Sequence, residues 1–141
     1  MGIFDKKPNI KKMLDLGDVE GLTNVLMAAK EKGDIKSQKG AIRALGSLRD
    51  SSCLPSLFNI LDTMKPTMTD HFSMFGDIAW ALGEIGDKRS RYYLEKLTRV
   101  GIDPVSGRPM QAMIIDSLPD VKSAIDYIQD QAAKALGKIS K

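Results

Sequence analysis

Apolar residues recur at helical spacing along most of this chain. They stand three or four positions apart and almost never alternate with polar residues, as they would in a strand. The clearest stripes of apolar residues lie in four segments, at residues 19–32, 34–49, 70–86 and 121–139. The pattern therefore predicts an all-α protein.

Short polar side chains mark the predicted starts of the helices. Asp18, Asp34 and Asp87 each stand just before an apolar stripe, where a carboxylate can accept hydrogen bonds from free backbone N–H groups. Ser51 or Ser52 is predicted to cap the short stripe that follows in the same way. These signals divide the chain into helices of ordinary length.

A short sequence phrase recurs near the end of three stripes. It reads Ala-Leu-Gly, then Ser, Glu or Lys, then Leu or Ile, at residues 44–48, 81–85 and 135–139. Gly46 and Gly83 are 37 positions apart, whereas Gly83 and Gly137 are 54 apart, so the last unit carries about 17 additional residues. Self-similarity at a period of about 20–50 residues is typical of stacked helical repeats.

The repeats divide one predicted domain, residues 1–141, into four units. Hairpins of two helices are predicted at approximately 9–33, 34–65 and 69–100. The last unit, 117–141, holds one long helix and follows an insertion at 101–116. The predicted architecture is an αα-superhelix, a solenoid of about three to four helical hairpins.

The recurring glycine needs a physical reason, because glycine inside a helix costs about 1 kcal/mol relative to alanine. Two explanations compete: close approach of a neighbouring helix, or termination of the helix by a glycine in the left-handed conformation. Leu48, Ile85 and Ile139 follow two residues after the glycines on the predicted core side. This favours close packing within the last turns.

The segments 41–50 and 79–87 carry a resemblance to a known repeat. The second of them, Ala-Trp-Ala-Leu-Gly-Glu-Ile-Gly-Asp, resembles the short HEAT-type repeats that are also found in phycobilisome lyases. The resemblance implies the fold but no single function, since such repeats occur in scaffolds, lyase chaperones, hydroxylases and nucleic-acid enzymes. Hydroxylase members resemble metal enzymes with His–Glu pairs, an activity that does not carry over because His71 is the chain's single histidine.

Composition narrows the functional classes. Twenty-one basic and 18 acidic residues give a formal charge of +3, and they are interleaved, so no dense basic patch for nucleic acid stands out. Acidic residues also interrupt the longest basic strip, which consists of Lys30, Lys32, Lys36, Lys39, Arg43 and Arg49. No apolar run is long enough for a signal peptide or a membrane span. We expect a cytoplasmic protein that acts neither on a membrane nor, as its first role, on nucleic acid.

Candidate chemistry is scarce in this sequence. One cysteine, Cys53, and one histidine, His71, cannot supply a His/Cys metal site with three or four protein ligands. Cys53 occupies the offset held by Gly21 and Ser90 in other units, which favours a small packed residue over a nucleophile. His71 is interpreted as a solvated or capping residue. The sequence predicts no catalytic residue, no metal and no cofactor.

The repeat alignment does single out candidate partner-binding residues. Trp80 occupies the slot held by Arg43 and Lys134 in other units, so this slot is predicted to face solvent or a neighbouring groove. Tryptophan there is either a packing residue or an interface anchor. Methionines near the insertion either cover the end of the core or form an exposed adaptable patch. The candidate contacts are Trp80, Arg43, Arg91, Arg108, Met110 and Met113.

The sequence therefore predicts a non-enzymatic scaffold or adaptor that binds a protein partner, which it does not identify. The groove is expected along the second helices of the hairpins, with the insertion as a contact. An accessory protein of lyase type, holding a tetrapyrrole or another flat ligand against Trp80 and the methionines, is the alternative. A nucleic-acid-binding repeat protein is the weaker alternative.

Overall fold

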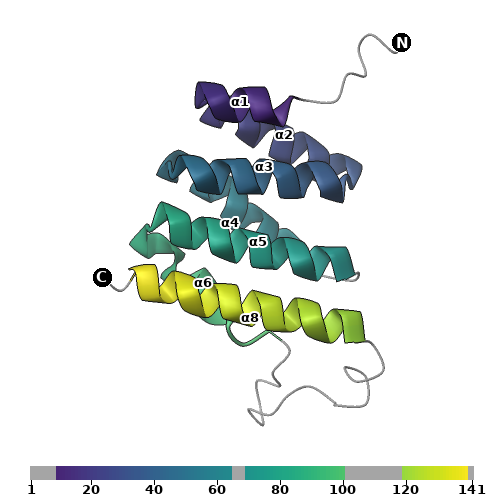
Figure 1. Cartoon of the computed structure of the whole chain (residues 1–141), viewed down its shortest axis with the longest axis vertical. Coiled ribbons are helices and arrows are strands. Elements are labelled where there is room, and N and C mark those ends of the chain that lie inside the picture. Colours follow the sequence, from purple (N-terminus) through teal and green to yellow (C-terminus); the bar gives the residue numbers. More distant parts are fainter. Residues whose placement is uncertain (1–8, 65–68, 101–118, 140–141) are drawn as a thin grey trace.

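Each apolar stripe forms a helix, because a spacing of three or four residues gathers its apolar side chains on one side. The computed structural model describes residues 9–64, 69–100 and 119–139. Within these ranges it contains helices and no strand, so the all-α prediction is confirmed (Figure 1). The α-helices are α1 (Ile10–Leu16), α2 (Val19–Lys32), α3 (Ile35–Leu48), α4 (Leu54–Thr63), α5 (Thr69–Ile85), α6 (Arg91–Leu97) and α8 (Pro119–Ile139).

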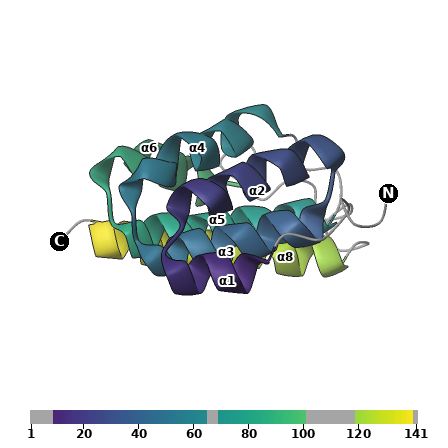
Figure 2. The ribbon, with the colours of Figure 1, turned by 90° about the horizontal axis from the view of Figure 1, so that it is seen from above.

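The helices stack in two layers, which Figure 2 shows from above. The helices α1, α3, α5 and α8 lie side by side in what we call the first-helix layer, and α2, α4 and α6 form the second-helix layer (Figures 1 and 2). The pairs α1–α2, α3–α4 and α5–α6 each fall inside one predicted unit, and α8 falls inside the fourth. The described residues thus form a solenoid of stacked helical pairs.

Neighbouring helices of the first-helix layer run parallel and in register. The Lys39 ammonium of α3 donates to the Ser73 hydroxyl of α5 at 2.8 Å. One turn further along both helices, Arg43 pairs with Asp77 at 2.7 Å. Asp77 in turn accepts a hydrogen bond from Tyr127 of α8 at 2.6 Å. Side chains of α3, α5 and α8, three successive helices of this layer, therefore meet at one place.

The predicted caps hold at α2 and α3, whereas a short 3₁₀ turn precedes both α4 and α6. The carboxylates of Asp18 and Asp34 accept hydrogen bonds from backbone N–H groups three residues on, at 2.8 and 3.1 Å, as predicted. The cap predicted at Ser51 or Ser52 is wrong. Asp50 instead accepts from the N–H of Ser52 at 2.8 Å, because its carboxylate closes a short 3₁₀ turn that precedes α4. Before α6, the carboxylate of Asp87 accepts from the N–H of Arg89 at 2.9 Å and caps that turn rather than α6 itself.

The core lies between the two layers. Leucine and isoleucine dominate it, and Met74 of α5 is also fully buried there. The largest fully buried side chains are Leu22, Leu26, Ile42, Leu45, Leu54, Leu57, Ile60, Met74, Ile78, Leu82, Leu94 and Ile128.

Glycine in the recurring phrase permits close approach of the next first helix. A Cβ at Gly46 would lie 2.9 Å from Cα of Ala81, and a Cβ at Gly83 would lie 2.8 Å from Cα of Ala135. These separations are too short for any side chain, so the close-packing explanation is correct for both positions. Gly137 differs, because a Cβ there meets nothing within 4 Å of the described residues.

Cys53 is a buried packing residue. Its side chain is fully buried, as is that of Ser90 at the equivalent position of the next unit. Burial raises the pKa of the Cys53 thiol to about 11, and its Sγ lies 3.2 Å from the carbonyl oxygen of Asp50, to which it donates. A thiol held protonated in this way is a poor nucleophile.

The glycine contacts predict opposite effects for the same substitution at two positions. Gly83→Ala should lower the free energy of unfolding by about 1–3 kcal/mol, because overpacking against Ala135 outweighs the gain in helix propensity. Gly137→Ala should raise it by up to about 1 kcal/mol, since its Cβ meets no described atom. Urea unfolding followed by circular dichroism measures both values. Equal stabilisation by the two variants would contradict the close approach.

The buried thiol predicts slow chemical modification. At pH 8 the folded protein should react with a disulfide reagent far more slowly than the urea-unfolded chain, because the folded thiol keeps its proton. The free energy of unfolding should also fall as the pH rises from 9.0 toward about 11, where only the unfolded thiol ionises. Replacing Cys53 with serine should remove that part of the pH dependence. Equally fast modification of both states would show that the thiol is accessible.

Candidate functional site

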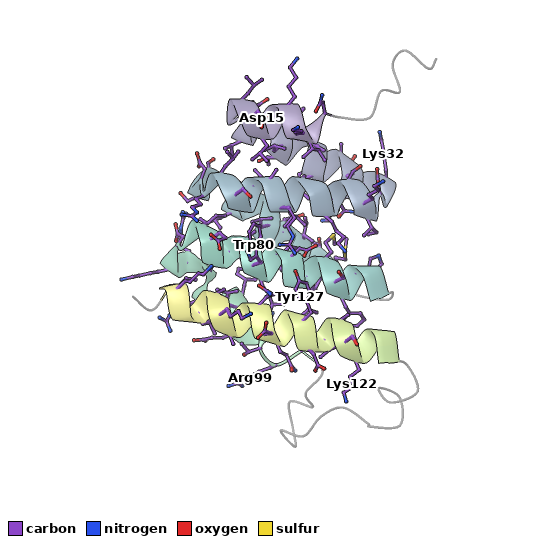
Figure 3. All side chains as sticks on the ribbon, viewed as in Figure 1. Asp15, Lys32, Trp80, Arg99, Lys122 and Tyr127 are labelled. Atoms are coloured by element: carbon purple, nitrogen blue, oxygen red, sulfur yellow. The ribbon has the colours of Figure 1, made fainter. Side chains whose placement is uncertain are left out.

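Trp80 is half-buried on α5 and faces both packing contacts and solvent. Its ring lies over Gly46 of α3, where an added Cβ would come within 2.6 Å of the ring. On the other side it borders a groove toward α8. The missing side chain at Gly46 thus makes room for the indole. The packing and exposure interpretations of Trp80 both describe part of its surface (Figure 3).

Arg43 lies against this ring and is held there by two further groups. Its guanidinium carbon lies 4.7 Å from the centre of the Trp80 ring, a cation–π arrangement. Its Nη2 donates to Asp77 at 2.7 Å and also to the hydroxyl of Tyr127. The side chain nevertheless remains 48% exposed. Arg43 and Trp80, two of the candidate contacts, therefore form one feature of the first-helix layer.

Asp77 is the buried centre of a polar cluster. Its side chain is 5% exposed and lies beside Arg43 and, at 3.9 Å, the ammonium of Lys39. The Tyr127 ring covers Gly76, and its hydroxyl donates to Asp77. Burial, together with this carboxylate, raises the pKa of Tyr127 from 10.0 to about 12, so its hydroxyl remains a hydrogen-bond donor to Asp77 even in mildly alkaline solution.

These groups line a shallow depression of about 460 Å³, which we call the Asp77 depression. It collects side chains from α3, α5 and α8. Its lining residues are Lys39, Gly40, Arg43, Ser73, Asp77 and Tyr127.

A second hollow, which we call the Trp80 groove, has a volume of about 580 Å³ and lies between α5 and α8. The indole, glycine and alanine contribute to its lining, together with two half-exposed lysines, Lys134 and Lys138. Lys134 pairs with Asp130 at 2.9 Å and Lys138 pairs with Glu84, so the rim carries both signs of charge. The lining residues are Trp80, Gly83, Gln131, Lys134, Ala135, Gly137 and Lys138.

These two hollows lie in the first-helix layer, whereas the partner-binding groove was predicted along the second helices of the hairpins. Trp80 and Arg43 lie on α5 and α3, which are first helices. A further hollow of about 370 Å³ is lined mainly by the second helix α2, so the groove along the second helices stays a prediction.

Of the remaining candidate contacts, Arg91 has a described position, and it does not join this site. Arg91 lies on α6 in the second-helix layer, 3.9 Å from Glu95. Arg108, Met110 and Met113 lie outside the described residues, as does the whole predicted insertion, 101–116. Of the six candidate residues, the structure brings together Trp80 and Arg43.

Sequence reasoning missed Asp77 and Tyr127. A signal for Asp77 was present, because a carboxylate stands directly before Ile78 and Ala79 inside an apolar stripe, at the slot held by Gly40 and Gln131 in other units. A charge on the inner side of a helix is expected to have a partner on a neighbouring element. Tyr127 gave no comparable signal, because its contact depends on how α8 is placed after the insertion.

The basic strip is divided among several partners. Lys30 donates to Asn59 of α4 at 2.7 Å, which links the second helices of two units. Arg49 pairs with Glu84 at 3.1 Å, and Lys39 and Arg43 face Asp77. The charges of Lys39, Arg43 and Arg49 are thus opposed by carboxylates, which interrupts the strip as a track for phosphates.

Other chemistry finds no support in the described ranges. These residues hold no group of three or more His, Cys, Asp or Glu side chains that could bind a metal ion. His71 is half-buried on α5. None of the helices described is long and apolar enough to cross a membrane.

The comparisons with known proteins agree with this architecture. The family model for the PBS lyase HEAT-like repeat matches residues 76–99, which span the second half of α5 and all of α6. No curated protein and no solved structure matches the chain. The matched repeat and the stacked parallel helices together identify the chain as an all-α HEAT-like repeat protein.

Proposed function

We propose that this chain is a non-enzymatic scaffold that binds a protein partner through the exposed side of its first-helix layer. The observation that carries the proposal is the position of Trp80. Its indole is fixed by Gly46 and Arg43, yet it borders an open groove. A rigid, partly exposed tryptophan is a typical anchor of a protein interface.

The stacked repeats favour binding for an energetic reason. Each first helix is held in register by its neighbours, so the surface exists before a partner arrives. Binding to such a surface orders few side chains and little backbone, which lowers the entropic cost of association. The Trp80 groove and the Asp77 depression have no lining residue in common, but Arg43 of the depression lies 4.7 Å from the ring of Trp80 in the groove. The two hollows are therefore neighbours, and one partner segment can contact both.

The alternatives receive less support. A lyase-type accessory role would require the Trp80 groove to hold a flat ligand. The match to a repeat named for phycobilisome lyases is the reason to consider this alternative. However, Lys134 and Lys138 at the rim are each paired with a carboxylate, and the groove is open. For nucleic acid, Lys39, Arg43 and Arg49 of the strip likewise face carboxylates.

Removing the indole should abolish capture of the partner. We expect the purified chain to retain one stoichiometric protein from a native lysate, and the Trp80→Ala variant to lose it, since truncation of such an anchor costs about 2 kcal/mol or more. Tyr92→Ala is the matched control, because Tyr92 is 61% exposed on α6 of the other layer. Circular dichroism confirms that each variant is folded. Equal capture by the wild type and Trp80→Ala would contradict the proposal.

A spectrum of the purified protein separates the scaffold from the flat-ligand alternative. The scaffold predicts no visible absorbance, before or after incubation with a linear tetrapyrrole. Binding of the pigment would instead produce a visible band and quench the emission of Trp80, the chain's single tryptophan. A band that disappears in Trp80→Ala would replace the scaffold proposal with the ligand-binding one.

A further inference from the structure

The Asp77 depression joins polar side chains from three helices of the first-helix layer. Lys39 and Arg43 come from α3, Ser73 and Asp77 from α5, and Tyr127 from α8. Two cations thus surround one buried carboxylate. The depression therefore has a local excess of one positive charge.

Arg43 is held in a fixed position, but not all of its N–H groups have a hydrogen-bond partner among the described residues. Its Nη2 makes the hydrogen bonds to Asp77 and Tyr127, and its flat guanidinium rests beside the Trp80 ring. Its Nε and Nη1 make no hydrogen bond with the described residues, and 48% of the side chain is exposed. An arginine held in this way presents unused N–H groups without needing to be ordered on binding.

Lys39 adds a second oriented cation. Its ammonium donates to the Ser73 hydroxyl at 2.8 Å and lies 3.9 Å from Asp77, while 34% of the side chain is exposed. An ammonium has three N–H donors, so it can bind a further acceptor. Both cations border the same open hollow.

We propose, building on the scaffold function above, that the Asp77 depression receives the carboxylate of an Asp or Glu side chain in an acidic segment of the partner protein. The carboxylate pairs with the unused N–H groups of Arg43 and with Lys39. A neighbouring apolar side chain of that segment enters the Trp80 groove.

Charge and geometry favour a peptide carboxylate over a nucleic acid. The planar guanidinium matches a carboxylate, and an ion pair beside a half-buried ring is less screened than one in open water. A nucleic acid would bring successive phosphates past Asp77, Glu84 and Asp130, which lie at or beside the two hollows. A single carboxylate with an apolar neighbour avoids that repulsion.

Selection from a phage-displayed library of random dodecapeptides on the full chain tests this proposal. The enriched peptides should be acidic and should place an apolar residue next to Asp or Glu. Synthetic copies of them are then titrated while the emission of Trp80 is recorded, which reports on this site because the chain has one tryptophan.

The variants separate the role of each cation from that of overall charge. Arg43→Gln should weaken binding of the acidic peptide at least about tenfold, and Lys39→Gln about threefold. Lys122→Gln, which removes an exposed charge from α8 away from the depression (Figure 3), should change the affinity less than about twofold. Lys39→Gln leaves the Arg43–Asp77 pair intact, so it stays informative if Arg43→Gln unfolds.

The outcomes distinguish this proposal from the scaffold function. Enriched peptides that are neutral or basic, but that still lose binding in Trp80→Ala, would overturn the acidic-segment proposal and leave the scaffold intact. A selection that yields no peptide would also overturn it, and the pull-down would then decide the scaffold function separately. Tighter binding of a labelled RNA oligonucleotide than of any peptide, with a steep loss of affinity in salt, would overturn both.

Discussion

The close approach of α5 to α3 at Gly46, and of α8 to α5 at Gly83, is the contact on which the rest of this structure depends. A Cβ at either glycine would collide with the backbone of the next helix, so both positions must be free of a side chain. The two contacts fix how far apart neighbouring first helices lie and how they are registered. Trp80 and Tyr127 occupy the space over Gly46 and Gly76 as a result.

The polar cluster follows from the same register and explains how a charge is tolerated there. Asp77 is nearly buried, and an isolated carboxylate in such a place would be strongly destabilising. Arg43, Lys39 and Tyr127 reach it from the two neighbouring helices, which connects three units across the layer. The cluster therefore serves stability and also holds Arg43 beside Trp80, where a partner can contact both.

The sequence predicted the helices, their stacking and the packing role of Gly46 and Gly83, because these features depend on local periodicity and on a repeated phrase. It also predicted that Trp80 and Arg43 occupy equivalent slots, from which their contact follows once the helices run parallel. The contact of Asp77 with Tyr127 could not be predicted in this way, since it joins residues 50 positions apart across an insertion. The start of α4 was missed because Asp50 closes a 3₁₀ turn that no periodicity marks.

The most direct test of this account is a proton nuclear Overhauser measurement between Gly46 and Trp80 in the isolated protein. Trp80 is the chain's single tryptophan, so its ring signals can be assigned without ambiguity. The account predicts a strong cross-peak between an α-proton of Gly46 and the ring proton on Cζ3 of Trp80, together with one from Gly46 to the Ala81 methyl. Absence of both cross-peaks in the folded protein would contradict the in-register stacking, and with it the surface proposed to bind a partner.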